Sequence, residues 1–344
     1  MEFRLAFIGF GNVARAFARV LHSRRELLAS RYDITLRAVG VATARHGSAV
    51  SDEGIDLIEA SAALERGARV TDLKGVRAAE DAYEVIERCR ASLLFETTTL
   101  SPLDGEPAAS YIKGALERGI NVVTANKGPV AFAYRELKSL AERSRACFRF
   151  EGTVMDGAPV FNLAEFCLPG ASIEGFSGVL NSTTNVVLDA MERGRSLEES
   201  LDEARKMGVA EANPDFDIDG WDAAVKAVVL ANVLMGADVR PGEVEREGIR
   251  GIRQDDIRSA RNQGMTIRLV ARSLKEGGNV RLRVAPERIP ADSALGSTRG
   301  TTNSLILRTD LMGDIAIIEN NPGVEQTAYA LLSDMIRVRS GTTL

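Results

Sequence analysis

The sequence predicts an α/β fold made of a Rossmann-like domain, with a doubly wound parallel sheet, and a second, α+β domain. Three observations support this prediction. The chain has 344 residues, more than one hydrophobic core usually organises. Up to about residue 152, short apolar runs alternate with helical patterns, which is typical of a parallel sheet with helices on both faces. A glycine-rich turn also follows the first apolar run.

The first domain covers residues 1–152, and its elements follow from the spacing of apolar residues. Short apolar runs predict strands, while apolar residues three and four positions apart predict helices. The expected strands are 3–9, 35–42, 92–96, 121–124 and 146–151. The expected helices are 12–30, 52–65, 81–88, 105–118 and 134–145.

The second domain covers residues 153–319, where strands and helices no longer alternate. Strand-like runs stand at 172–180, 279–285 and 303–319, and helical patterns at 185–192, 196–207 and 223–235. An amphipathic helix is expected at 325–337. We expect the segment 320–344, which contains this helix, to pack back on the first domain.

Charge and hydropathy exclude several classes of protein. Lys and Arg number 43 and Asp and Glu number 48, so the net charge of −5 argues against a partner that is nucleic acid or an anionic membrane. The N-terminus lacks the pattern of a signal peptide. No apolar run approaches the ~20 residues that span a bilayer. We therefore expect a cytoplasmic protein.

Cysteine and histidine are scarce, which limits the chemistry. The three cysteines, Cys89, Cys147 and Cys167, are too widely spaced for a disulfide framework and indicate a reduced protein. The only histidines are His22 and His46, so neither a structural zinc site nor a conventional catalytic triad is expected. Any acid–base chemistry is expected to fall to Lys, Asp and Glu.

The segment GFGNVA, directly after the first strand, has the pattern GxGxxA of a dinucleotide-binding turn. Gly9 allows the tight turn, Gly11 lets the backbone approach a pyrophosphate, and Ala14 permits close packing of helix and strand. The helix that begins at Asn12 and Val13 offers free N–H groups to the phosphates. The alternative is a tight strand–helix turn that binds no ligand.

The end of the second expected strand favours NADP as the cofactor, with NAD possible. An NAD-binding domain usually places Asp or Glu there, for the ribose 2′-hydroxyl. This chain instead has the segment ATARH, in which Thr43 and Arg45 could hold a 2′-phosphate. The alternative is that Arg45 is an ordinary solvated surface charge.

A set of lysines and carboxylates stands in two segments, NVVTANKGP and GVAEANPDFDIDGWDAAVK. Lys127 follows a strand of the parallel sheet, at the end where ligands bind. Asp222 and Lys226 are four residues apart on one helical face and can touch. Glu211 and Asp217 lie in the loop before that helix. Such a set suits binding of an amino group and proton transfer to oxygen, but a capping cluster with a simple ion pair and a solvated Lys127 remain alternatives.

These residues resemble the homoserine dehydrogenase family, in its short form without a kinase or regulatory domain. The resemblance implies an oxidoreductase that interconverts L-homoserine and L-aspartate 4-semialdehyde with NAD(P)(H), a step towards threonine and methionine. It also implies a homodimer whose second domain binds substrate and forms the interface. The similar segments are GFGNVARAF (9–17), 96–131, FEGTVMDGAPV (150–160), GVLNSTTNVVL (178–188), MGVAEANPDFDIDGWDAAVK (207–226) and TAYALLSD (327–334).

The resemblance assigns roles to individual residues of the substrate site. Lys226 is the expected acid–base group, and Lys127 is its companion near the reacting oxygen. Asp222 would hold the Lys226 ammonium or the substrate hydroxyl, while Glu211 and Asp217 would take the substrate amino group. Thr183, in the segment LNSTTN, would offer hydrogen bonds to the substrate.

The resemblance also implies cofactor and cation contacts. Thr97 and Thr98 would lie along the cofactor, and Asn126 and Lys127 near its nicotinamide. A structural Na+ would be bound by hard oxygen ligands. The expected ligand positions are Glu151, Val154, Asp156 and Ala158.

The chain departs from the family pattern at a few positions. Ser182 replaces a glycine that lines the substrate site, Met155 and Asp156 stand where glycines are common, and the turn at 320–324 is shortened. These departures keep two alternatives open. The first is the same fold acting on another small hydroxy or oxo acid, and the second is a non-catalytic NADP-binding paralogue.

Overall fold

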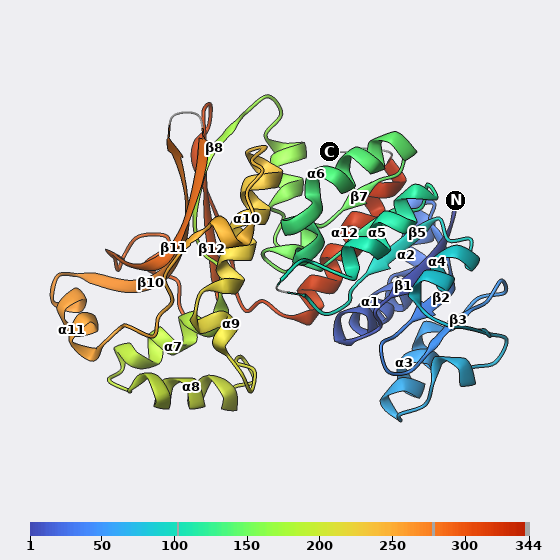
Figure 1. The fold of residues 1–344 in the computed structure, drawn as a ribbon, viewed down its shortest axis with the longest axis horizontal. Coiled ribbons are helices and arrows are strands. Elements are labelled where there is room, and N and C mark those ends of the chain that lie inside the picture. The colour runs from blue at the N-terminus through green and yellow to red at the C-terminus, as the bar shows by residue number, and fades with distance from the viewer. Residues whose placement is uncertain (102, 277–278, 341–344) are drawn as a thin grey trace. The chain divides into compact units, whose positions relative to one another are not determined.

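In the computed structural model, which describes residues 1–101, 103–276 and 279–340, the chain divides into two units (Figure 1). The first unit comprises Met1–Pro159 and the terminal segment that begins at Gly323, and the second comprises Val160–Pro322. The sequence placed this boundary near residue 152. Residues 341–344, which belong to the segment expected to return to the first domain, lie outside the described residues.

The first unit contains a seven-stranded sheet with the order β4-β3-β2-β1-β5-β6-β7. Five neighbouring strands are parallel: β1 (Glu2–Ile8), β2 (Thr35–Ala42), β5 (Leu93–Glu96), β6 (Asn121–Thr124) and β7 (Phe148–Arg149). Two short strands at one side of the sheet, β3 (Ser48–Val50) and β4 (Arg77–Ala79), are antiparallel to their neighbours and were not predicted. Because β1, β5 and β6 run the same way, their carboxyl ends meet at one edge of the sheet.

The helices of the first unit stand between these strands in the chain, except α12, which follows the second unit. They are α1 (Asn12–Ser23), α2 (Arg25–Tyr32), α3 (Leu57–Glu65), α4 (Ala82–Arg88), α5 (Ala108–Glu117), α6 (Lys127–Ser144) and α12 (Val324–Ser340), with short 3₁₀ turns at Val70–Asp72 and Glu151–Thr153. The single helix predicted at 12–30 is broken at Arg24, whose backbone leaves the helical conformation. Helix α6 begins seven residues earlier than predicted, because Asn126 caps it by accepting a hydrogen bond from the Gly128 N–H.

The core of the first unit joins the sheet to its first and last helices. Phe7 of β1 stacks on Phe95 of β5 with ring centroids 5.2 Å apart, and Phe17 of α1 packs against Phe95 at 4.7 Å. Helix α12 lies against α1 (Figure 1) and places Leu331 and Met335, both fully buried, in the same core. The turn between β1 and α1 is therefore held on a rigid base.

The second unit is built on a six-stranded sheet of mixed direction, and its described residues also form helices. The strand order is β13-β12-β8-β10-β11-β9. The strands are β8 (Ile173–Val179), β9 (Glu245–Arg246), β10 (Met265–Glu276), β11 (Asn279–Pro290), β12 (Asn303–Thr309) and β13 (Gly313–Glu319). The helices are α7 (Ser182–Glu192), α8 (Leu197–Lys206), α9 (Asp215–Ile218), α10 (Trp221–Leu234) and α11 (Gln254–Asn262), with shorter turns at Leu163–Cys167 and Pro241–Glu243.

The predicted fold class is confirmed: a Rossmann-like α/β unit is followed by a unit with a second, mixed sheet. Strand β10 and helix α11 were not predicted. Strand β10 carries Arg268, which is fully buried and pairs with Asp189 at 2.7 Å and with Glu192 at 3.3 Å, both on α7. A charged residue at a buried position hides the alternation that identifies a strand.

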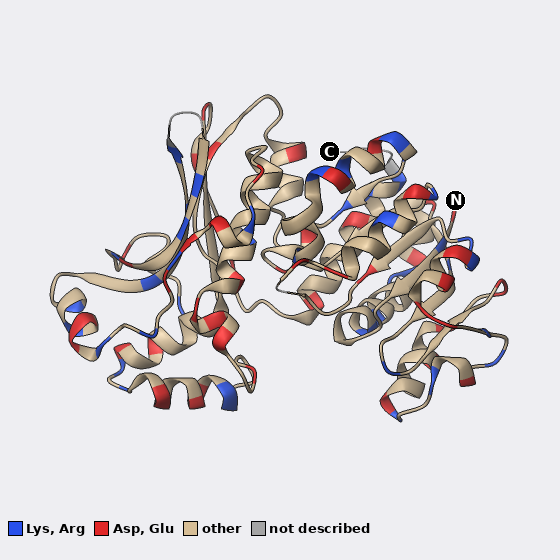
Figure 2. Ribbon diagram, in the orientation of Figure 1, with Lys and Arg blue, Asp and Glu red and all other residues tan. Residues whose placement is uncertain are grey.

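Acidic and basic residues are interspersed over both units, as Figure 2 shows. Within the described ranges, no helix is long and apolar enough to cross a membrane.

Candidate functional site

The turn between β1 and α1 has the geometry of a phosphate-binding turn. Gly9 has φ +86°, and a Cβ on it would lie 2.6 Å from the backbone carbonyl carbon of Thr97. The Thr97 hydroxyl donates to the Gly9 carbonyl at 2.9 Å and ties the turn to the end of β5. Among the described residues, no atom beyond its chain neighbours lies within 4 Å of where a Cβ on Gly11 would stand.

Helix α1 leaves the N–H groups of its first turn available. Its N-cap is Gly11, which has no side chain, and no other described side chain caps the helix. Asn12 is exposed and Val13 is half-buried at this end. Free N–H groups and the positive end of the helix dipole together favour an anion such as a pyrophosphate. The residues therefore fit the cofactor that their pattern predicts.

The loop after β2 carries positive charge and no carboxylate. The Thr43 hydroxyl donates to the Gly47 carbonyl at 2.9 Å and accepts from the His46 N–H at 2.8 Å, so its proton shapes the loop. Arg45 is exposed, and no hydrogen bond or ion pair holds its side chain in the part of the chain that the structure describes. The guanidinium of Arg69 lies beside the same loop, 3.4 Å from where a Cβ on Gly47 would stand.

The carboxyl ends of β5 and β6 are joined by a buried carboxyl group that the sequence analysis did not single out. Glu96 is fully buried. Its Oε1 accepts from the N–H of Thr98 at 2.8 Å and from the Thr98 hydroxyl at 2.5 Å, and its Oε2 accepts from the Thr124 hydroxyl at 2.7 Å. Burial raises the pKa of Glu96, while these donors favour the ionised form.

Asn126 and Lys127 follow β6 directly and are placed by this network. The Asn126 N–H donates to the Thr124 hydroxyl at 2.9 Å, and its side-chain amide donates to the Thr98 carbonyl at 3.3 Å. Lys127 is half-buried and is the first residue of α6, not a residue of an open turn. The structure thus brings Thr97, Thr98 and Asn126 together at one edge of the sheet, with Lys127 next in the chain.

In the second unit, Lys226 lies in the second turn of the buried helix α10. Its Nζ donates to the Leu180 carbonyl at 2.6 Å and lies 3.1 Å from Oδ2 of Asp222. The exposed fractions of the two side chains are only 14% and 9%. The expected contact between positions 222 and 226 is therefore present, in surroundings that exclude most water.

Asn181 connects this ion pair to Asp217. Its side-chain nitrogen donates to Oδ1 of Asp217 at 2.7 Å and to Oδ2 of Asp222 at 2.9 Å. The Thr183 hydroxyl lies 2.9 Å from Oδ2 of Asp217. Burial, followed by the negative charge of Asp222, raises the pKa of Asp217. We call Asn181, Thr183, Asp217, Asp222 and Lys226 the lysine cluster.

The charges of the lysine cluster do not balance when both aspartates are ionised. Within the lysine cluster itself, Asp217 and Asp222 supply two carboxyl groups and Lys226 supplies one ammonium. A buried site with one excess negative charge is stabilised by a cation from outside. The cluster is therefore suited to a ligand that carries an ammonium group next to a reacting oxygen.

Two predicted substrate residues lie outside the lysine cluster. Glu211 is exposed, and within the described residues its side chain has no hydrogen-bond or ion-pair partner. The Ser182 hydroxyl donates to the Thr301 carbonyl at 2.8 Å, so its proton is already used in the loop that precedes β12. Asn181, by contrast, was missed: it is the N-cap of α7, which begins three residues before the helix predicted at 185–192.

The segment expected to hold a cation lies in the first unit. Glu151 is buried, and its N–H donates to the Asp334 carboxylate at 2.8 Å. Asp156 has φ +35°, and its Oδ1 accepts from the Thr327 hydroxyl at 3.0 Å. Val154 is buried and Ala158 half-buried. Among the described residues, no group of three or more His, Cys, Asp or Glu side chains could hold a metal ion, so a cation here would depend on backbone carbonyls.

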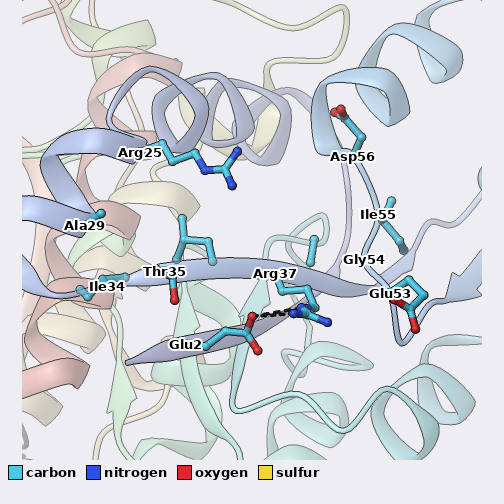
Figure 3. Close-up of a pocket in the computed structure, with 12 residues that line it drawn as sticks. Glu2, Arg25, Ala29, Ile34, Thr35, Arg37, Glu53, Gly54, Ile55 and Asp56 are labelled. Carbon is cyan, nitrogen blue, oxygen red and sulfur yellow. Dashed lines mark hydrogen bonds and ion pairs between the residues drawn. The ribbon is translucent and has the colours of Figure 1, made fainter.

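A cavity of about 490 Å³ lies elsewhere in the first unit (Figure 3). It is lined by residues at the amino ends of β1 and β2, where Arg37 donates to Glu2 at 3.0 Å, and by Arg25 of α2. Ligands of doubly wound sheets bind at the carboxyl ends of the strands. This cavity is therefore not the cofactor site.

Comparisons with known proteins identify the family of the chain. The family model described as "Homoserine dehydrogenase, NAD binding domain" matches residues 9–151, and the one described as "Homoserine dehydrogenase" matches residues 159–336. The chain is 37% identical over 345 residues to the NAD(+)-dependent homoserine dehydrogenase of Pseudomonas canavaninivorans, covering 99% of this chain and 97% of the relative. It is 33% identical to the homoserine dehydrogenase of Methanocaldococcus jannaschii, covering 98% of this chain and 99% of the relative.

Solved structures show the same similarity. A putative homoserine dehydrogenase from Archaeoglobus fulgidus has a TM-score of 0.86 and 33% identity, covering 98% of this chain and 99% of that one. A hyperthermophilic archaeal homoserine dehydrogenase in complex with NADPH has a TM-score of 0.83 and 29% identity, covering 98% of both chains. The similarity therefore extends over both units.

Proposed function

The chain belongs to the homoserine dehydrogenase family, and we propose that the lysine cluster carries out that family's reaction, the interconversion of L-homoserine and L-aspartate 4-semialdehyde. It is an NAD(P)-dependent oxidoreductase of amino-acid biosynthesis, on the route to threonine and methionine. The observation that carries the proposal is the buried network in which Asn181 joins Asp217 to the ion pair of Asp222 and Lys226. An amino-acid substrate brings the missing ammonium group and the hydroxyl to be oxidised.

Lys226 is proposed as the acid–base group. In the direction of homoserine oxidation, a neutral Lys226 takes the proton of the substrate hydroxyl as the carbon–oxygen double bond forms. The nicotinamide cofactor, when bound, accepts the hydride from the same carbon. In the reverse direction the Lys226 ammonium stabilises the developing alkoxide and returns the proton. The Leu180 carbonyl and Asp222 hold Nζ in place for this transfer.

Asp217 is proposed to receive the substrate amino group, with Asn181 and Thr183 holding its carboxylate in position, while Asp222 holds the Lys226 ammonium or the substrate hydroxyl. Glu211 is proposed to contribute to the same ammonium, and Ser182 to shape the wall of the site through its bond to Thr301. Since Glu211 is exposed and unpaired among the described side chains, this role requires its loop to bring it to the bound substrate.

The cofactor is proposed to lie along the carboxyl edge of the first unit's sheet. Its pyrophosphate binds at Gly9, Gly11, Asn12 and Val13, and its nicotinamide lies beside the segments that follow β5 and β6. We propose NADP as the preferred form, because Arg45 and Arg69 flank a loop without a carboxylate. Thr43 shapes this loop. The Pseudomonas relative is named as NAD(+)-dependent, so NAD+ is the competing cofactor in the assay below.

Two further features are proposed for the whole protein. A structural Na+ is bound by oxygens of Glu151, Val154, Asp156 and Ala158, supported by the buried Glu151. The protein forms a homodimer through the sheet of the second unit, where Ile318 on the edge strand β13 is half exposed. Light scattering on purified protein tests the dimer, and calorimetry with and without Na+ tests the cation.

The reaction is tested with purified protein, L-homoserine and either NADP+ or NAD+, by following reduced nicotinamide. Other small hydroxy acids serve as controls. Reduction of the nicotinamide that depends on homoserine and is faster with NADP+ than with NAD+ supports both the proposed substrate and the proposed cofactor. Reduction with a different hydroxy acid but not with homoserine would contradict the proposed substrate.

A further inference from the structure

Glu96 is a fully buried carboxylate on the first unit's cofactor edge, and the proposed proton transfer does not use it. It stands at the carboxyl end of β5, directly before Thr97 and Thr98, and it reaches across to β6 through Thr124. A buried charge is retained only where many partners compensate its desolvation. Its position next to residues proposed to line the nicotinamide suggests a role in catalysis.

The hydrogen bonds of Glu96 fix the segments after β5 and β6 relative to one another. Oε1 binds both the N–H and the hydroxyl of Thr98, and Oε2 binds the hydroxyl of Thr124. The same Thr124 hydroxyl accepts the Asn126 N–H, and the Asn126 amide binds the Thr98 carbonyl. These hydrogen bonds form a closed ring through Glu96, Thr124, Asn126 and Thr98. A change at Glu96 is therefore expected to displace both Thr98 and Asn126.

All the groups that face Glu96 in these bonds are donors. An ionised carboxylate accepts all of them, whereas an amide in its place presents an NH₂ group to donors on one side. Glu96→Gln therefore keeps the shape of the side chain. When its oxygen accepts from Thr98, its NH₂ group faces Thr124, and the Thr124 hydroxyl proton loses its acceptor.

We propose that Glu96 is a positioning residue for hydride transfer, which holds Thr98 and Asn126 in the arrangement that orients the nicotinamide. The inference rests on the proposed function, since it assumes that the nicotinamide lies at this edge. Glu96 touches neither substrate nor cofactor and acts through its two neighbours. The pyrophosphate turn at Gly9 and Gly11 makes no hydrogen bond to its side chain within the described residues.

The test compares Glu96→Gln with a matched surface variant, Glu117→Gln, on the exposed face of α5. We expect Glu96→Gln to lower kcat by about 10- to 100-fold, because small misplacement of a reacting group has effects of this size. The Kd for NADPH should change less than ~3-fold, since phosphate contacts supply most of the anchoring. The kinetic isotope effect with C4-deuterated NADPH should rise, because hydride transfer becomes slower than product release. Glu117→Gln should change none of these.

A second readout does not depend on turnover. The fluorescence lifetime of the bound NADPH nicotinamide should change in Glu96→Gln and not in Glu117→Gln. The reason is that the excited state of a nicotinamide ring decays at a different rate when the ring is held less firmly. If wild-type protein binds NADPH but does not oxidise homoserine, the proposed function fails while this lifetime still tests Glu96. A lifetime and a kcat that both stay at wild-type values, with only the melting temperature lowered, would overturn the positioning role.

Thr124→Val provides a second test in case Glu96→Gln does not fold. Valine has nearly the shape of threonine and removes only the hydroxyl that links Glu96 to Asn126. We expect a smaller decrease of kcat in the same direction, again at nearly constant Kd for NADPH. In the double variant with Glu96→Gln, the two decreases should not multiply, because both changes break one network. Fully multiplicative effects would contradict the proposal.

Discussion

Replacing Asp217 by Asn is expected to stabilise the second unit while it weakens substrate binding. Burial and the charge of Asp222 raise the pKa of Asp217 in the folded protein. A carboxyl group with a raised pKa stabilises the folded state fully below its unfolded pKa, and this contribution is lost as pH rises through the folded pKa. Above its folded pKa the ionised Asp217 therefore destabilises the fold, and an uncharged Asn removes that effect.

The magnitude follows from the geometry around Asn181. Its nitrogen lies 2.7 Å from an oxygen of Asp217 and 2.9 Å from one of Asp222, so the two oxygens are about 4–5 Å apart. Two unit charges at that separation repel by about 4 kcal/mol at an effective dielectric constant of ~20. Lys226 and the hydrogen-bond donors offset most of this, which leaves a net gain of about 1 kcal/mol. For a unit of this size, that raises Tm by about 2–4 °C.

Asparagine fits the position without a new unsatisfied group. Its oxygen can accept the bond from Asn181, and its nitrogen can donate to the Thr183 hydroxyl. That hydroxyl already lies 3.2 Å from the Val209 carbonyl, which can accept its proton instead. The loss of one carboxylate removes a charged partner of the substrate ammonium, so KM for homoserine should rise by about 10- to 100-fold.

Calorimetry near neutral pH and near pH 4, together with steady-state kinetics, checks both effects. The gain in Tm should shrink as the pH falls, because Asp217 itself becomes protonated. The control is Asp219→Asn in the same loop, where Asp219 pairs with Arg250 at 2.5 Å and is more exposed. We expect that variant to lose up to ~1 kcal/mol and to keep its KM. A Tm below wild type for Asp217→Asn at neutral pH, or an unchanged KM, would refute the reasoning.

The remaining predictions concern the first unit. Gly9→Ala should lower Tm and abolish cofactor binding, because its Cβ would clash with the Thr97 backbone. Gly11→Ala should keep Tm and weaken NADPH binding, because its Cβ would meet no atom of the described residues beyond its chain neighbours. Equal melting temperatures for the two variants would contradict the turn geometry. Arg45→Ala should raise KM for NADP+ by about 10-fold or more and leave KM for NAD+ within ~2-fold; parallel changes would exclude a 2′-phosphate contact. Glu151→Gln should abolish any increase of Tm by Na+ over K+, and an increase that persists in this variant would rule out its carboxylate as a ligand.

Much of the fold was predictable, because the spacing of apolar residues indicates the strands and helices and the glycines mark the cofactor-binding turn. The strands at 35–42 and 121–124 have the bounds that apolar spacing predicts, and the GxGxxA turn stands between β1 and α1. The predictions were wrong where contacts with distant residues or a capping side chain determine the bounds or the presence of an element. Helix α6 starts at Lys127 because Asn126 caps it, and β10 was hidden by the buried Arg268, whose partners lie about 80 residues away in the chain.

The site was predictable in part. The i,i+4 contact of Asp222 and Lys226 follows from helical spacing alone. Asn181 and Glu96 were missed because their importance lies in the partners that the fold brings to them. Each left a weak signal, an Asn at a helix start and a charge at the end of a buried strand. Glu211 shows the opposite case, since a carboxylate near a cluster in the sequence is exposed in the structure.

The central claim, that Lys226 transfers the proton, is tested most directly by single-turnover kinetics of Lys226→Ala. With L-homoserine and NADP+, we expect turnover to fall by about 10²- to 10⁴-fold, the contribution of a positioned acid–base group, while the Kd for NADPH stays within ~2-fold of wild type. Lys206→Ala, at the exposed end of α8, should behave as wild type. Turnover of Lys226→Ala near the wild-type rate, or loss of NADPH binding in step with activity, would contradict the account.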